Sequence, residues 1–201
     1  MVSVLAVIGA VMGWLLGLAM AAEWGIADAP EVPGISPLAR WMQAAVPVEE
    51  AGRLYFASML LILPVVWQVT GAVSTRARRV VVGAVSVAAV AFALEYNGAE
   101  GYGWLFDLLA LLIALAGTLV TGVLGLRRHA IPASVAWALI AAVPMTPLAA
   151  LLVLGYMAPA AAMGLLIAWA VASVAWVRSS RVFAMDHESV RAGDEAISGV
   201  G

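Results

Sequence analysis

Six long apolar stretches are the feature that most constrains what this chain folds into. They cover residues 2–22, 54–73, 80–96, 104–126, 131–155 and 160–177. A helix needs about 20 apolar residues to cross the roughly 30 Å of hydrocarbon in a bilayer. The third stretch is short, with 17 residues, so its helix must stand nearly upright or extend into its flanks. The sequence therefore predicts an all-α, polytopic integral membrane protein built as a six-helix transmembrane bundle.

Composition excludes several other classes of protein. Of the 201 residues 65% are apolar, and the mean hydropathy is +1.05. Soluble domains are nearer half apolar, so an ordinary soluble domain, a nucleic-acid binder and a disordered chain are all excluded. The chain has no Cys and no Lys, which excludes thiolate, Fe–S and Schiff-base chemistry. We expect no cofactor and no metal ion, and the Arg-only, Ala- and Val-rich composition suggests a bacterial source.

The placement of Arg predicts the orientation of the bundle. Eight of the ten Arg lie between spans two and three, between spans four and five, or after span six. Cytoplasmic segments are enriched in Arg, so both termini are expected on the cytoplasmic side of the cell membrane. The first stretch lacks a basic flank and is long for a signal peptide, so we expect it to be retained. One transmembrane domain is then predicted over residues 1–178, and a polar, partly disordered cytoplasmic tail over 179–201.

Three further patterns predict local structure. The outer loop, residues 23–53, contains an amphipathic stretch at 35–45 that predicts either an interfacial helix or a loop packed over the bundle. Pro64 in span two and Pro144 and Pro147 in span five predict kinks. Gly residues recur every fourth position at 9, 13 and 17, which predicts a close-packing face, more likely within the bundle than between two copies.

Four carboxylic acids lie near the predicted outer boundary of the membrane. Glu49 and Glu50 precede span two, Glu95 ends span three, and Asp107 lies one turn inside span four. Spans three and four form a tight hairpin, so Glu95 and Asp107 can approach each other. Burial disfavours the charged form of a carboxyl group, and a neutral acid can donate a proton. These four residues are the candidate catalytic residues; the alternative is that they are interfacial side chains in contact with water.

Aromatic side chains gather near the same acids. Tyr55, Tyr96 and Trp104 lie at a similar predicted depth, and Trp67 lies deeper. These four are the candidate substrate-binding residues, because aromatic faces line apolar pockets and stabilise cations. The alternative is an interfacial aromatic belt for Trp104 and ordinary core packing for Trp67.

One short motif resembles a known family. The string Val46-Pro47-Val48-Glu49-Glu50, followed by Leu54-Tyr55-Phe56 and an apolar span, resembles the Pro-x-Glu-Glu motif of the lycopene cyclase domain of carotenoid cyclases. Glu23-Trp24 and Asp28 stand roughly where that family has a Trp–acid pair. The resemblance implies a metal-free, acid-initiated cyclisation of a long isoprenoid with Glu49 and Glu50 as the functional pair. It covers about ten residues closely, and the family's aromatic block directly after the acids is replaced by Ala51-Gly52-Arg53.

Three classes of function remain open at this point. The first is a membrane-embedded enzyme, a cyclase or isomerase, that acts on a lipophilic, isoprenoid-like substrate by acid–base chemistry. The second is a small-solute channel or transporter, and the third is a non-catalytic subunit of a membrane complex, either as a homo- or a hetero-oligomer. The acidic and aromatic residues near the outer boundary favour the enzyme. The absence of Arg, Lys or His deep within a span argues against ion-coupled transport.

Overall fold

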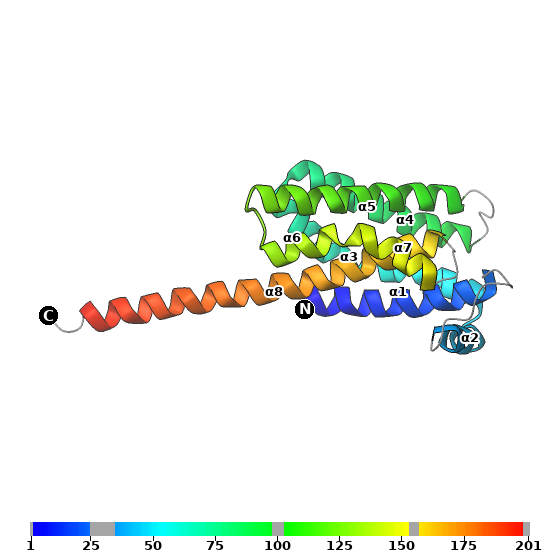
Figure 1. Cartoon of the computed structure of the whole chain (residues 1–201), viewed down its shortest axis with the longest axis horizontal. Helices are drawn as coiled ribbons and strands as arrows, with labels where there is room; N and C mark the ends of the chain where they lie inside the picture. Colours follow the sequence, from blue (N-terminus) through cyan, green and yellow to red (C-terminus); the bar gives the residue numbers. More distant parts are fainter. Residues whose placement is uncertain (1, 25–34, 98–102, 153–156, 199–201) are drawn as a thin grey trace.

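The computed structural model describes the backbone of residues 2–24, 35–97, 103–152 and 157–198, and side chains for 2–22, 35–97, 103–151 and 160–180. This part of the chain is entirely helical and contains no strand. Figure 1 shows the long helices side by side in a bundle. The helices are α1 (Val2–Trp24), α2 (Ile35–Ala45), α3 (Val48–Val73), α4 (Thr75–Glu95), α5 (Gly103–Arg127), α6 (Ala133–Ile140), α7 (Ala142–Leu152) and α8 (Met157–Ser198).

Five helices are long and apolar enough to cross a membrane. They are Val2–Ala22 within α1, all of α3, α4 and α5, and Ala160–Ser180 within α8. Their outward surfaces are apolar, as Ile8 on α1, Val87 on α4 and Val120 on α5 illustrate, each about half exposed. A soluble protein rarely leaves so much contiguous apolar surface open to water, whereas a bilayer requires it. The all-α fold predicted from the sequence is confirmed for the described residues, with five helices that could cross a membrane; the count of six spans and their orientation stay predictions.

The remaining apolar stretch forms a bent pair of helices. α6 and α7 meet at Ala141 and differ in direction by 42°. Pro144 follows the bend by three residues, and its ring crowds the carbonyl of Ile140 while it removes a backbone donor. The predicted kink in this span is therefore confirmed, whereas α3 runs unbroken through Pro64.

A single residue separates α3 from α4. Ser74 has an extended backbone, its N–H donates to the Thr70 carbonyl over 2.9 Å, and its hydroxyl accepts from the Arg76 N–H over 3.2 Å. α4 therefore begins at Thr75, five residues before the start predicted from hydropathy. The short third stretch does extend into its flank, and its first turns carry the Arg residues.

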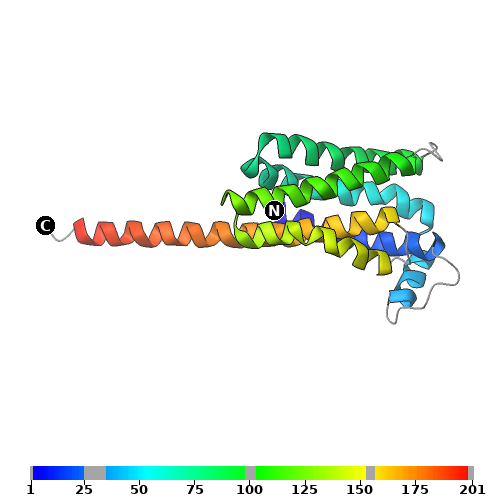
Figure 2. The same ribbon diagram turned by 45° about the horizontal axis from the view of Figure 1, so that its top comes forward.

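The two segments outside the apolar core are both helical. Of the two alternatives for residues 35–45, the structure shows the helix, α2, which lies across one end of the bundle (Figures 1 and 2). Its Met42 side chain is buried and its Trp41 side chain is exposed. The sequence predicts a separate tail from residue 179, but the backbone of α8 continues as helix through that position to Ser198. Figure 2 shows this extension projecting beyond the other helices.

The glycine face of α1 packs inside the bundle, as the spacing predicts. Gly9 and Gly13 lie against Ser58 of α3, and Gly17 lies against Tyr55 and Met163. A Cβ atom on Gly9 would lie 2.7 Å from the Ser58 carbonyl oxygen and 2.9 Å from the Leu61 Cβ atom. Backbone cannot yield easily at such a contact, so α1 depends on the absence of a side chain there.

Substitution of Gly9 tests this contact. We expect Gly9→Ala to lower the free energy of unfolding by about 1–3 kcal/mol, because the new methyl group overpacks the interface between α1 and α3. Gly83→Ala is the matched control, since nothing lies within 4 Å of the Cβ position at Gly83. Unfolding in mixed micelles should show the control to be neutral or slightly stabilised. Equal stability of both variants would contradict the tight contact.

Candidate functional site

Asp107 is the polar side chain on which the candidate site is built. It lies four residues into α5, about 6 Å along the axis from its first residue. Its side chain is 0% exposed, and among the described residues neither carboxyl oxygen has a hydrogen-bond partner. Buried carboxyl groups are normally paired or hydrogen-bonded because their desolvation is costly. An unpartnered one therefore needs an explanation beyond packing.

The buried face of α5 directs Asp107 into the bundle. Gly103, Ala110, Leu111 and Ala114 are buried with it at helical spacing, whereas Trp104, Leu105 and Phe106 point outward. The inward face thus combines small residues with one carboxyl group. Asp107 is held in place by the packing of its own helix and not by a polar partner among the described residues.

Glu95 lies close to Asp107 across the hairpin of α4 and α5. A Cβ atom on Gly103 would lie 2.6 Å from the Glu95 Cβ atom and 3.2 Å from the Ala91 carbonyl oxygen, so the two helices touch at this level. Glu95 is partly buried, and Asp107 follows Gly103 by about one helical turn. The structure thus brings together the two acids that the sequence placed on opposite arms of the hairpin.

Tyr55 completes the buried cluster from α3. Its side chain is fully buried, and its ring lies 4.8 Å from the ring of Phe92 on α4, tilted by 43°. Like Asp107, Tyr55 lies on the buried face of its helix. Asp107, Glu95 and Tyr55, from three different helices, form what we call the acidic cluster.

Tyr96 follows Glu95 in the chain and packs between helices at the same end of the bundle. Its ring lies directly on Gly52, where any Cβ atom would overlap it, and its hydroxyl donates to the Met20 sulfur over 3.6 Å. Arg53 donates from Nε to the Tyr96 carbonyl oxygen over 3.1 Å. α1, α3 and α4 are therefore linked through one aromatic side chain at the boundary of the bundle.

Glu49 and Glu50 do not join the acidic cluster. Both side chains are exposed in the first turn of α3, and Glu50 forms an ion pair with Arg53 over 2.9 Å. An exposed pair of this kind contributes about 1 kcal/mol or less. Glu23, Trp24 and Asp28, which complete the resemblance to the lycopene cyclase domain, lie outside the described side chains.

The two candidate Trp side chains occupy different places. Trp104 is about half exposed at the start of α5, on the outward face of the helix. Trp67 lies twelve residues beyond Tyr55 on α3, about 18 Å along the axis, and its ring is stacked under the Arg78 guanidinium group at 4.6 Å. Of the four aromatic candidates, only Tyr55 is fully buried in the bundle, and Tyr96 packs on Gly52 at its boundary.

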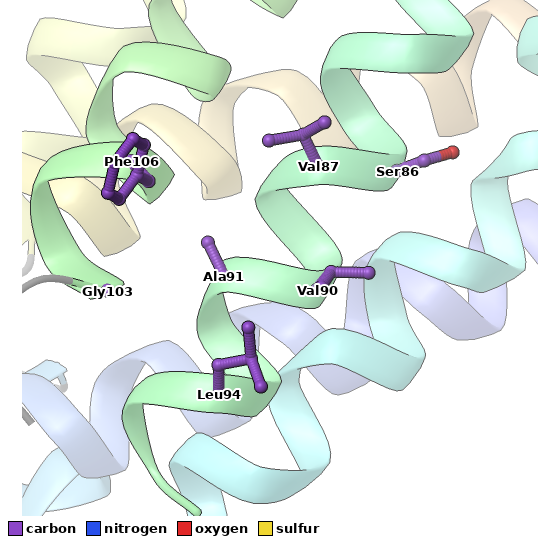
Figure 3. A pocket seen from close by; sticks show the side chains of 7 residues that line it. All are labelled: Ser86, Val87, Val90, Ala91, Leu94, Gly103 and Phe106. Carbon is purple, nitrogen blue, oxygen red and sulfur yellow. The ribbon is translucent and has the colours of Figure 1, made fainter. Parts of the chain in front are cut away.

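An apolar cavity of about 550 Å³ lies on the membrane-facing side of α4 and α5, and no residue of the acidic cluster lines it. Figure 3 shows Phe106 on one side of it and Val87, Ala91 and Leu94 on the other. Gly103 and Ala91 line this cavity and also form the contact that separates it from Glu95. Its volume is in the range of sites that bind small molecules. An apolar molecule in the bilayer can reach this cavity without crossing water.

Several residues that shape the site escaped the sequence analysis. Phe92, Met20, Gly52 and Gly103 contribute through long-range contacts that no local pattern reveals. For Gly103 a signal exists, since a Gly at the foot of a tight hairpin allows the two arms to touch. The described residues contain no group of three His, Asp or Glu that could hold a metal ion.

Comparison with known protein families, with characterised proteins and with solved structures gives no match for this chain.

Replacement of Asp107 by an apolar residue of the same branching tests whether the carboxyl group is a structural element. Asp107→Leu removes an unpartnered buried polar group, so we expect the free energy of unfolding to rise by about 1–3 kcal/mol. Reversible unfolding in mixed micelles measures it. A loss of stability would mean that the carboxyl group has a stabilising partner, and the reason for regarding it as functional would disappear.

Thr118 provides a contrasting test on the same buried face of α5. Its hydroxyl accepts a 3.1 Å hydrogen bond from the Trp169 indole N–H, and both side chains are fully buried. Thr118→Val keeps the shape but leaves the indole N–H unsatisfied, so we expect a loss of about 1–3 kcal/mol. Thr118→Ser, which keeps the hydroxyl group, should lose less than Thr118→Val in the same measurement.

Proposed function

We propose that the chain is a multi-pass protein of the cytoplasmic membrane that crosses it six times, with both termini inside. The bent pair of α6 and α7 counts as one span in this topology. The support is the placement of Arg76, Arg78 and Arg79 at the start of α4 and of Arg127 and Arg128 at the end of α5, which puts them at the same end of the bundle.

Fusion of topology reporters tests this arrangement. Fusions made after Arg79 and Arg128 should report a cytoplasmic position, a fusion after Glu100 an outer position, and one at the C-terminus a cytoplasmic position. The reason is the retention of Arg-rich connections on the cytoplasmic side. An outer signal after Arg128 would reverse the orientation, and an outer signal at the C-terminus alone would show that α6 and α7 do not span.

We propose further that the protein is a membrane-embedded enzyme that acts on a lipophilic, isoprenoid-like substrate by acid–base chemistry. The observation that carries this proposal is the fully buried and unpartnered carboxyl group of Asp107 on the inward face of α5. An apolar cavity that opens toward the bilayer lies on the other face of the same hairpin, behind the contact between Gly103 and Ala91. Strong acids for carbon chemistry need a dry site, and a lipophilic substrate needs lateral access. Both conditions meet at the α4–α5 hairpin.

The proposed reaction is a double-bond isomerisation, with or without ring closure. The neutral carboxyl group of Asp107 gives its proton to an alkene carbon, so that a C–H bond forms and a carbocation is left on the substrate. Loss of a proton from a neighbouring carbon to Glu95 restores a double bond. The proton then returns to Asp107, directly or through water, and no oxidant or reductant is needed.

Tyr55 has a distinct role in this scheme. Its ring is packed against Phe92, so it presents a fixed aromatic face near the acids. The negative face of an aromatic ring stabilises a cation in a dry environment. Tyr96 and its contact with Gly52 exclude water from the outer side. Of the partners that the sequence offered to Asp107, the geometry favours Glu95 over Glu49 and Glu50.

The resemblance to the lycopene cyclase domain suggests the same class of chemistry but different acids. It assigns the proton donor to the Pro47–Glu50 motif, where the side chains of Glu49 and Glu50 are exposed. The present proposal depends on Asp107 and is independent of that resemblance.

A second candidate function is proton-coupled transport. It is favoured by the buried carboxyl group together with the broken helix formed by α6 and α7, because transporters use intramembrane acids and discontinuous helices. In that case Asp107 would carry a proton between the two sides of the membrane and would form no bond to carbon.

Deuterium incorporation tests the proposed enzyme. The protein in nanodiscs that contain lipid extract of its native membrane is incubated in ²H₂O, and the lipids are analysed by mass spectrometry. We expect deuterium at carbon in a lipophilic product. Asp107→Asn keeps the shape but has no proton to give, so labelling should fall by roughly 10²-fold or more. Glu49→Gln, an exposed acid outside the acidic cluster, is the matched control and should label as the wild type does.

The results that contradict the enzyme are equally defined. Absence of labelled lipid with the wild-type protein, or equal labelling with Asp107→Asn, would exclude Asp107 as a proton donor to carbon. Proton uptake into liposomes that requires Asp107, without labelled lipid, would establish the transport function instead.

A further inference from the structure

A second cavity lies at the other end of the α4–α5 hairpin, and it is lined differently from the first. Its volume is about 560 Å³, and it combines the side chains of Arg76 and Arg128 with an apolar wall. Ser74, at the junction of α3 and α4, lies at the same end. Val80 and Val81 of α4 and Ile113, Val120 and Leu124 of α5 form most of the wall.

The two Arg side chains carry charges that no described group neutralises. Arg76 and Arg128 are both exposed. The ion pair between Glu50 and Arg53 lies on α3 and involves neither of them. The acids of α4 and α5 are Glu95 and Asp107, both at the opposite end of the hairpin. Arg78 differs, because its guanidinium group is folded onto Gly71 and stacked on Trp67.

The wall of this cavity is a long apolar groove that faces the membrane. Val80, Ile113 and Val120 are each about half exposed along it. From Ile113 to Leu124 the groove follows eleven residues of α5, about 16 Å along the axis, and Arg128 lies just beyond the end of this helix. Val87 and Phe106, which line the first cavity, lie two helical turns from Val80 and Ile113, which line the second. The two cavities therefore lie along the same faces of α4 and α5. The groove thus has a cationic end at the membrane boundary and an apolar length within the bilayer.

From this juxtaposition we infer that the groove between α4 and α5 binds one anionic phospholipid. The phosphate of the headgroup lies between Arg76 and Arg128, and one acyl chain lies along the apolar wall. Guanidinium groups bind phosphate oxygens through paired, charge-assisted hydrogen bonds. Basic pockets between transmembrane helices on the cytoplasmic side are suited to anionic headgroups. This site is independent of the chemistry proposed for Asp107.

Other occupants fit the groove less well. Free phosphate would use the two charges but none of the apolar wall, and a lipid without net charge would leave the excess positive charge uncompensated. A second copy of the chain would have to bury Arg76 and Arg128 at its interface. The corresponding faces of α4 and α5 offer no acid at that level with which to pair them.

Native mass spectrometry of the full-length protein in detergent tests this inference. Phosphatidylglycerol and phosphatidylcholine are added separately, and the dissociation constant of the first bound lipid is measured for each. We expect one phosphatidylglycerol to bind at least tenfold more tightly than phosphatidylcholine, a difference of about 1.4 kcal/mol. The double variant Arg76→Gln/Arg128→Gln should lose this preference.

Two further variants distinguish the parts of the site. Arg79→Gln/Arg127→Gln is the matched control, because it removes the same amount of charge from two exposed Arg residues that do not line the groove. This control should keep the preference for phosphatidylglycerol within about threefold. Ala116→Phe fills the apolar wall while both Arg of the site remain, so it should also lose tight binding of the lipid. A thermal melt of each variant confirms that it is folded.

The outcomes that overturn the inference are clear. Equal loss in the two double variants would show general attraction to surface charge. Tight binding retained by Ala116→Phe, or equal competition by inorganic phosphate, would show a site for the phosphate group alone. A dimer that Ala116→Phe dissociates, with lipid binding unchanged, would assign the groove to a second copy of the chain.

Discussion

Close approach of helix backbones at Gly residues is the constraint on which the rest of this bundle depends. In a bilayer the hydrophobic effect does not press helices together, so van der Waals contact must do so. Gly9 brings α1 onto α3, Gly122 brings α5 onto the backbone of α6, and Gly103 brings the start of α5 onto Glu95. The last of these contacts also holds the partly buried Glu95 close to the helix that carries Asp107. Packing and candidate chemistry therefore rest on the same small residues.

The burial of Asp107 gives the bundle an internal asymmetry. One end of the bundle contains Asp107, Glu95 and the Tyr rings, and the other end contains exposed Arg side chains beside an apolar groove. The two cavities lie along the same membrane-facing groove between α4 and α5, at opposite ends of the hairpin. The hairpin therefore offers the bilayer two different surfaces, one suited to a neutral lipophile and one to an anionic headgroup.

Much of the fold could be predicted because membrane spans obey a simple length requirement. The kink near Pro144 and the close-packing glycine face of α1 could also be predicted, because both depend on local sequence. The predicted start of α4 was wrong because hydropathy detects only the apolar part of a helix. Arg is a good helix former, so the helix continues through the Arg residues that precede its apolar part. The rotation of α3 about its own axis determines why Glu49 and Glu50 lie outside the acidic cluster. The buried face of α3 passes through Ala51, Gly52 and Tyr55, which turns both acids outward. The contact between Tyr96 and Gly52 joins residues far apart in sequence, and no local pattern contains it.

The single-residue connection at Ser74 has a mechanical consequence. A loop of several residues lets two helices slide and rotate past each other, but one extended residue between two hydrogen-bonded ends allows almost no such freedom. α3 and α4 are thus tied together at that end, and their relative motion is confined to hinging about Ser74. A small change in angle there grows in proportion to distance along the helices. Tyr55 on α3 and Glu95 on α4 lie far from Ser74, so such a change in angle would displace them more than residues near the connection.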